Sequence, residues 1–183
     1  METFLLKFKQ IALLLSVRVE AARALAGADP SMLTVQQRRR LQKTTAELIK
    51  AELASADRPE THVNPSAIYV NLGQPETAEK ELRTALRLAP DFVPALVNLA
   101  DLYRLLQRDA DAEPLLHHAV KVSPEAAEPA HALGLLLVRK GNRIEALSWL
   151  KKAVELAPNE ARYSDVLNIV QKELGNNETG GLK

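Results

Sequence analysis

The chain has 183 residues, of which 46% are hydrophobic and 26% charged, so it is long enough for one compact domain or one short repeat array. Only 4% of the residues are aromatic, whereas alanine and leucine are abundant, and this mixture favours packed helices over a sheet. The net charge of +1 excludes strong steering of the whole molecule onto nucleic acid, and the absence of cysteine excludes disulfides, thiolate metal sites and covalent c-type haem attachment in this chain.

The first 57 residues are expected to form a pair of helices. Residues 2–27 predict one amphipathic helix that packs on its neighbour, because Lys7 and Lys9 interrupt the apolar positions. That interruption disfavours a cleaved signal peptide, and the apolar runs are too short to span a membrane. Thr34 begins a capping box and predicts the start of a second helix, which ends near residue 57.

A repeat of 34 residues follows. Prolines recur at positions 90, 124 and 158, and three small or apolar columns keep the same spacing before them. An alanine column lets two helix backbones approach closely, a leucine column fills the space between paired helices, and a turn position suits a left-handed residue. The columns are Ala78, Ala112 and Ala146; Leu82, Leu116 and Leu150; Ala85, Ala119 and Ala153; and, at the turn, Gly73, Gln107 and Gly141.

This pattern resembles the tetratricopeptide repeat, a helix–turn–helix unit of 34 residues. The resemblance covers residues 59–158 as three repeats, with a capping helix expected over 161–174. It implies an all-α fold, a right-handed tetratricopeptide superhelix over residues 58–175, preceded by the N-terminal helical pair. Residues 176–183 are polar and rich in glycine and are expected to be disordered.

The first repeat departs from the pattern at Pro65, which stands where the later repeats have leucine. Proline removes a ladder hydrogen bond from a helix interior, at a cost of about 3 kcal/mol if nothing relaxes. We therefore expect the first helix of this repeat to be irregular or to begin near Pro65.

A second resemblance concerns the N-terminus. Residues 16–27 are similar to the second helix of a HEAT-type repeat. The order of HEAT-like helix, linking helix and tetratricopeptide units looks like the C-terminal part of bacterial multihaem cytochrome-like proteins. That resemblance implies a bacterial source and an extracytoplasmic parent protein. Without cysteine, the chain would be the non-haem end of such a protein or a stand-alone relative, soluble in the cytoplasm or periplasm.

Candidate chemical groups are sparse in the sequence. His117 and His118 are adjacent, so on a helix they point about 100° apart and cannot share one metal ion. His62 and His131 are isolated in the sequence. No glycine-rich phosphate loop or nucleophile elbow is present, so neither an enzyme nor a bound cofactor or metal is expected. Residues 38–40 are three arginines, which suggest either an anion contact or a solvated helix face.

In tetratricopeptide arrays the first helix of each repeat lines the concave side, where peptides bind. By register, we expect the following groove residues here: Val97, Asn98, Asp101, Arg104, Leu105, His131, Leu135, Val138, Arg139, Arg162, Asp165 and Ile169. Some family members clamp a peptide carboxylate with Lys, Asn and Arg residues. Of the matching positions here only Asn98 fits, so no such clamp is expected.

Three functions remain open. The preferred hypothesis is a non-enzymatic scaffold that binds a peptide or protein partner in the groove. The alternative is an assembly module of a larger cytochrome-like protein, or a homodimer formed through the N-terminal helices by Leu5, Ile11 and Leu15. The third is a nucleic-acid binder that uses the arginines at 38–40. We expect a protein or peptide partner, with neither nucleic-acid binding nor membrane insertion.

Overall fold

A computed structural model describes residues 34–36, 39, 43, 45–47, 49 and 57–180, with side chains up to residue 175. The chain divides into two compact units, Met1–Leu88 and Ala89–Lys183, and each is described here by itself. This division falls inside the stretch expected as one repeat array, whereas the expected boundary at residue 57 stays a prediction. The expectations for residues 2–27, including the HEAT-like helix and the dimer contacts, lie outside the described residues.

Unit 1 contains a helical pair, α3 (Glu60–Asn71) and α4 (Pro75–Leu88). The two helices pack on each other across a short turn. Earlier in the unit, Val35 and Gln36 are helical and directly follow Thr34. The described residues between 39 and 49 are helical too. The expected helix start at Thr34 agrees with this placement.

The expectation for Pro65 was wrong. Helix α3 runs unbroken from Glu60 to Asn71 with Pro65 inside it, and the proline ring is buried. Its first turn is closed by backbone bonds to residues three positions back, Thr61 N to Arg58 O and His62 N to Pro59 O, both 3.2 Å. Because Pro65 follows this turn closely, the missing N–H removes one ladder bond near the helix start instead of splitting a long helix.

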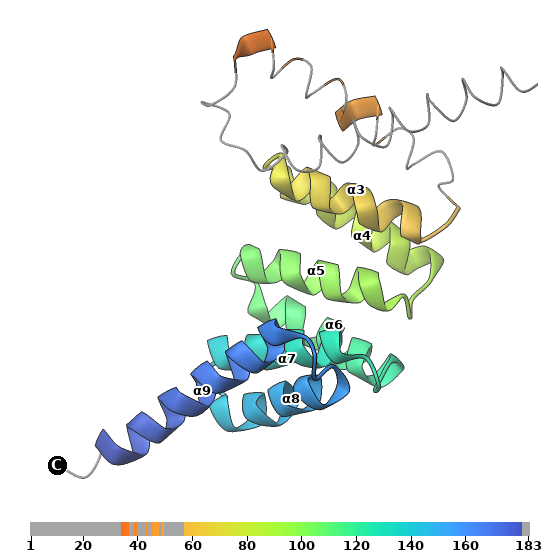
Figure 1. Ribbon diagram of the computed structural model, residues 1–183. Coiled ribbons are helices and arrows are strands. Elements are labelled where there is room, and N and C mark those ends of the chain that lie inside the picture. The colour runs from red at the N-terminus through yellow and green to blue at the C-terminus, as the bar shows by residue number, and fades with distance from the viewer. Residues whose placement is uncertain are drawn as a thin grey trace, which may run out of the picture. The chain divides into compact units, whose positions relative to one another are not determined.

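Unit 2 contains five consecutive helices (Figure 1). They are α5 (Val93–Leu105), α6 (Asp109–Val122), α7 (Ala127–Arg139), α8 (Arg143–Leu156) and α9 (Ala161–Gly180). Helix α5 packs on α6 and α7 on α8, while α6 contacts α7 and α8 contacts α9. The described residues contain helices and no strand. The expected all-α architecture of helical pairs followed by a terminal helix is confirmed.

The alanine and leucine columns form the contact between paired helices. Ala78, Ala112 and Ala146 are fully buried, and Leu82, Leu116 and Leu150 are at most 3% exposed. A close approach lies in the third repeat, where Gly134 of α7 faces Leu150 of α8. A methyl group added at Gly134 would lie 2.7 Å from Leu150 Cγ and Cδ2. The pairs can therefore close only because one side of each contact is small.

The expected left-handed turns are confirmed. Gly73, Gln107 and Gly141 have φ angles of 69°, 59° and 82°, and each follows the first helix of its repeat. Glycine adopts this conformation freely, but a residue with a Cβ atom loses about 1–2 kcal/mol there. The α5–α6 turn at Gln107 is thus the strained member of this column.

The end of the chain differs from expectation. Helix α9 was expected to end near residue 174 with a disordered tail from 176, but it continues to Gly180. Gly175 occupies the turn column, yet its φ angle is not positive, unlike those of Gly73 and Gly141. A left-handed turn forms where a following helix packs back on the first, and no helix follows α9 among the described residues. The expectation for residues 181–183 lies outside the described chain.

We predict that Gly134→Ala destabilises the protein although alanine is the better helix former. The clash with the fully buried Leu150 should cost about 1–3 kcal/mol, more than the roughly 1 kcal/mol gained in helix propensity. Urea unfolding of the two proteins measures the difference. The matched control is Gly175→Ala, which meets open space in α9 and should be neutral or stabilising. Equal shifts for both variants would contradict the close approach.

Candidate functional site

The expected groove residues lie on α5, α7 and α9, the first helices of unit 2, and define what we call the first-helix face. Its exposed members are Asn98, Leu105, Arg139, Arg162, Asp165 and Ile169, and its half-buried members are Asp101, Arg104, His131, Leu135 and Val138. Val97 does not belong to it, because its side chain is only 5% exposed. Valine at this position packs inward as part of the core of α5, so the expectation for Val97 is corrected.

On α7 and α9, the N-terminal end of the first-helix face is polar and aromatic. On α5, nearer the C-terminal end of the helix, Arg104 Nε lies 3.2 Å from Asp101 Oδ1. On α7 and α9, the His131 and Tyr163 rings have centroids 4.5 Å apart at an angle of 40°. The Arg162 guanidinium carbon lies 4.7 Å from the Tyr163 ring centroid, and Arg162 Nη2 donates a hydrogen bond to Tyr163 Oη at 3.0 Å. These contacts join α7 and α9 into one surface.

His131 is the titratable group at the centre of this polar end. Burial lowers its pKa below the ordinary value of 6.5, the positive charge of Arg162 lowers it further, and Asp101 opposes both effects. The imidazole is therefore neutral at pH 7. Its Nε2 atom is buried and has no hydrogen-bond partner among the described residues. Protonation would place a second cation beside Arg162.

Apolar side chains lie toward the C-terminal end of the first-helix face, which we call its apolar end. Leu105 and Ile169 are each 58% exposed, which is unusual for large aliphatic side chains, and Leu135 and Val138 are half-buried. Leu135 and Ile169 occupy the same repeat position as Asp101, so along this column the side chain changes from acidic on α5 to aliphatic on α7 and α9. The face can thus contact both a charged and an apolar group.

Arg139 has a role inside the protein. Its Nε lies 3.2 Å from Asp109 Oδ2 and its Nη2 lies 3.2 Å from Asp109 Oδ1, so the guanidinium meets the carboxylate with two nitrogens. The neighbouring Lys140 Nζ lies 2.6 Å from Glu113 Oε2. Both pairs join the end of α7 to the start of α6. Their main effect is to hold consecutive repeats together.

Sequence reasoning missed Tyr163 as part of this site. Its side chain is 3% exposed and packs with Ala130, Ala153 and the half-buried Trp149, so it anchors α9. The sequence did carry a signal for it: Tyr163 is an aromatic residue at the start of the capping helix, in a chain that has few aromatic residues. His131 stands alone in the sequence, and its ring contact with Tyr163 was not predicted.

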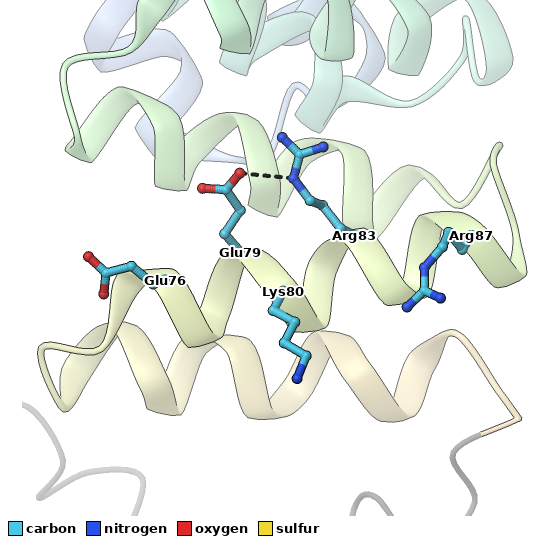
Figure 2. A pocket seen from close by; sticks show the side chains of 5 residues that line it. All are labelled: Glu76, Glu79, Lys80, Arg83 and Arg87. Atoms are coloured by element: carbon cyan, nitrogen blue, oxygen red, sulfur yellow. Dashed lines mark hydrogen bonds and ion pairs between the residues drawn. The ribbon is translucent and has the colours of Figure 1, made fainter.

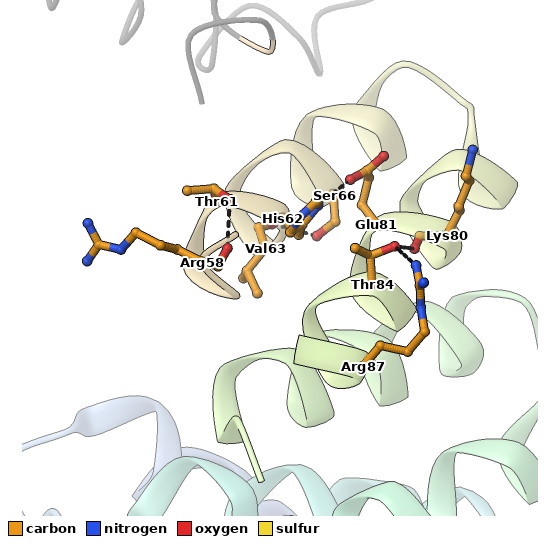
Figure 3. Close-up of polar contacts among 9 residues, drawn as sticks. All are labelled: Arg58, Thr61, His62, Val63, Ser66, Lys80, Glu81, Thr84 and Arg87. Carbon is orange, nitrogen blue, oxygen red and sulfur yellow. Dashed lines mark hydrogen bonds and ion pairs between the residues drawn. The ribbon is translucent and has the colours of Figure 1, made fainter. Parts of the chain in front are cut away.

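The other histidines have structural contacts. His62 also stands alone in the sequence, and in the structure it is buried in unit 1 with Nδ1 2.6 Å from Glu81 Oε2 (Figure 3). His118 Nε2 lies 2.6 Å from Asp91 Oδ1, while His117 is exposed. Within the described part of the chain, no group of three or more His, Cys, Asp or Glu side chains is placed to hold a metal ion. Of residues 38–40, only Arg39 is described, and it is helical and exposed.

A shallow depression of about 470 Å³ runs along α4 in unit 1. Figure 2 shows its lining, in which Glu79 Oε1 lies 2.8 Å from Arg83 Nε. The lining residues Glu76, Glu79, Lys80, Arg83 and Arg87 carry both charge signs and all come from one helix. This arrangement is typical of a solvated helix surface and offers no convergent set of ligand groups.

Comparison of the sequence with known protein families identifies the family of this chain. Two models described as tetratricopeptide repeat match residues 69–128 and 127–160, a stretch that runs from the end of α3 through α8. The chain is a tetratricopeptide repeat protein. None of the helices in the described range is both long and apolar enough to cross a membrane. The expected bacterial source stays a prediction.

Solved structures and one curated relative extend this similarity. MamA residues 41 to the end from Desulfovibrio magneticus RS-1 share 20% identity and a TM-score of 0.62, over 90% of this chain and 89% of that one. The first tetratricopeptide domain of Spaghetti (RPAP3), bound to the HSP90 peptide SRMEEVD, shares 19% identity and a TM-score of 0.61, over 64% of this chain and 96% of that one. Human protein O-mannosyl-transferase TMTC3 is 24% identical over 155 residues, or 76% of this chain, which spans 17% of that protein's length.

We predict that His131 makes the stability of the tetratricopeptide protein depend on pH. Because its folded pKa is below 6.5, the unfolded state binds more protons as pH falls through about 6.5, so the free energy of unfolding decreases there and is regained at higher pH. Urea unfolding at pH 7.5 and 5.5 measures the slope. His131→Gln should flatten it, whereas the control His117→Gln, at an exposed histidine, should leave it unchanged. An equal slope in His131→Gln and the parent protein would contradict this.

Proposed function

We propose that this protein is a non-enzymatic scaffold that binds a protein or peptide partner on the first-helix face of unit 2. The observation that carries the proposal is the continuity of this face, where ring contacts join α7 to α9 and a polar end adjoins exposed leucine and isoleucine side chains. The family supports a role in protein–protein interaction. The likeness to a tetratricopeptide domain bound to an HSP90 peptide gives further support.

The chemistry of the face favours an amphipathic partner. Leu105 and Ile169 each expose more than half of their area, and covering aliphatic surface stabilises a complex by about 25 cal/mol per Å² before the costs of association. Arg162 and Asn98 remain exposed and can donate hydrogen bonds to carboxylate or carbonyl groups of the partner. A purely acidic peptide would leave the apolar end uncovered, and a purely apolar one would leave the polar end desolvated.

The partner need not end in a carboxylate held by a clamp. The positions that match a family clamp hold Val63, Ala67, Asn98, Glu128 and Ala132, none of which is cationic. An internal amphipathic segment therefore fits these residues better than a free C-terminus. We also infer that the chain acts without catalysis of its own, since the transferase similarity covers 17% of that relative's length.

Substitution at the apolar end tests the proposal. Peptides selected on the full chain from a displayed library of amphipathic sequences provide the probe, and their dissociation constants are measured by calorimetry. Ile169→Glu should weaken binding at least about tenfold, because it removes aliphatic area and places a carboxylate against the partner's apolar side.

Ile144→Glu is the matched control, since Ile144 is 85% exposed on α8, outside the first-helix face. It should leave the dissociation constant within about twofold. Selected peptides that bind equally to both variants and the parent chain would contradict the assignment of the face. Failure of such a library to yield any binder would contradict the amphipathic specificity.

A further inference from the structure

The buried residues of helix α3 differ from those of the first helix in the second repeat. In α3 they are His62, Pro65, Ser66 and Ile68. At the positions 34 residues later than the first three, α5 buries Leu96, Leu99 and Ala100. Thus two leucines and an alanine of the second repeat are replaced by a titratable ring, a residue without an N–H and a hydroxyl. Of the four buried residues of α3, Ile68 alone has a large aliphatic side chain.

The polar contact between α3 and α4 occupies an apolar position of the repeat. His62 Nδ1 lies 2.6 Å from Glu81 Oε2, with the two side chains only 7% and 15% exposed. The corresponding pairs are Leu96 with Leu115 in the second repeat and Ala130 with Trp149 in the third, where Trp149 packs against the cluster that contains Ala130. Removing two polar groups from water offsets much of their mutual attraction, whereas apolar side chains in the same place gain from burial.

Two further polar contacts of α3 are local. Ser66 Oγ donates to Val63 O at 2.6 Å, and Thr61 Oγ1 donates to Arg58 O at 2.7 Å (Figure 3). Both bonds lie within α3 or at its start, so they do not tie the helix to α4. The start of α3 has Pro59 at the N-cap position with no side-chain cap, and Pro65 cannot donate to the helical ladder.

We propose that α3 is an opening element, which separates from α4 while the helices of unit 2 stay folded. Few buried apolar side chains, compared with α5, and the ladder bond that Pro65 cannot make place it at the low-stability end of the described chain. Opening uncovers the small apolar face of α4, formed by Ala78, Leu82 and Ala85. The first repeat is then an order–disorder switch, and a partner that contacts closed α3 shifts it toward the folded state.

Native-state hydrogen exchange on the full chain tests this proposal. Amides of Ile68, Tyr69 and Val70 in α3 should exchange at least about tenfold faster than those of Leu136, Leu137 and Val138 in α7. Their rates should also respond less to low urea concentrations, because local opening exposes less surface than global unfolding. Equal rates and equal urea dependence in the two helices would overturn the proposal.

Two matched double variants test the cause. His62→Leu/Glu81→Leu places the apolar pair of the second repeat into the first, and should slow exchange in α3 at least about tenfold while leaving α7 unchanged. Leu96→His/Leu115→Glu places the polar pair of the first repeat into the second, and should speed hydrogen exchange of the amides in α5. If the second protein does not fold, the first still decides, because unchanged α3 rates in His62→Leu/Glu81→Leu would refute the role of the polar pair.

Discussion

The rest of the fold depends on the close approach of two helix backbones within each repeat. Fully buried alanines in α4, α6 and α8 allow that approach, and in the third repeat Gly134 leaves room for Leu150. Because the two backbones lie close together, the small residues of each helix must face its partner. The remaining side chains of the first helix then point away from that contact. The first-helix face follows from this orientation, since leucine and tyrosine already fill the side of the helix that faces its partner.

The periodic part of the structure was predictable from sequence because the interactions that produce it repeat. Helix pairs, left-handed turns and the buried columns follow from spacing, and the structure confirms them. Pro65 was misjudged because the cost of a helix proline depends on its distance from the helix start, which spacing alone does not give. Helix α9 ran past its expected end for a related reason, since Gly175 keeps a φ angle that is not positive and no described helix follows it.

The candidate site was predictable in outline but not in its contacts. Register placed His131 and Arg162 on the same face, yet it did not show that Tyr163 lies between them in contact with both. It also placed Val97 on the face, whereas packing turns this small aliphatic side chain inward. The pair of His62 and Glu81 was missed because its members are 19 residues apart and meet only after the turn reverses the chain. Contacts of this kind depend on side-chain direction, which a repeat pattern does not specify.

The irregular columns of α3 have a consequence for designed repeat arrays. A consensus built by averaging the repeats would replace Pro65 with leucine, which both later repeats have, and would lose His62 and Ser66, because neither later repeat has histidine or serine at these positions. Such an array would have more uniform helix cores. The three departures therefore carry information that averaging erases, and a library meant to preserve the behaviour of this protein must treat its first repeat as a separate template.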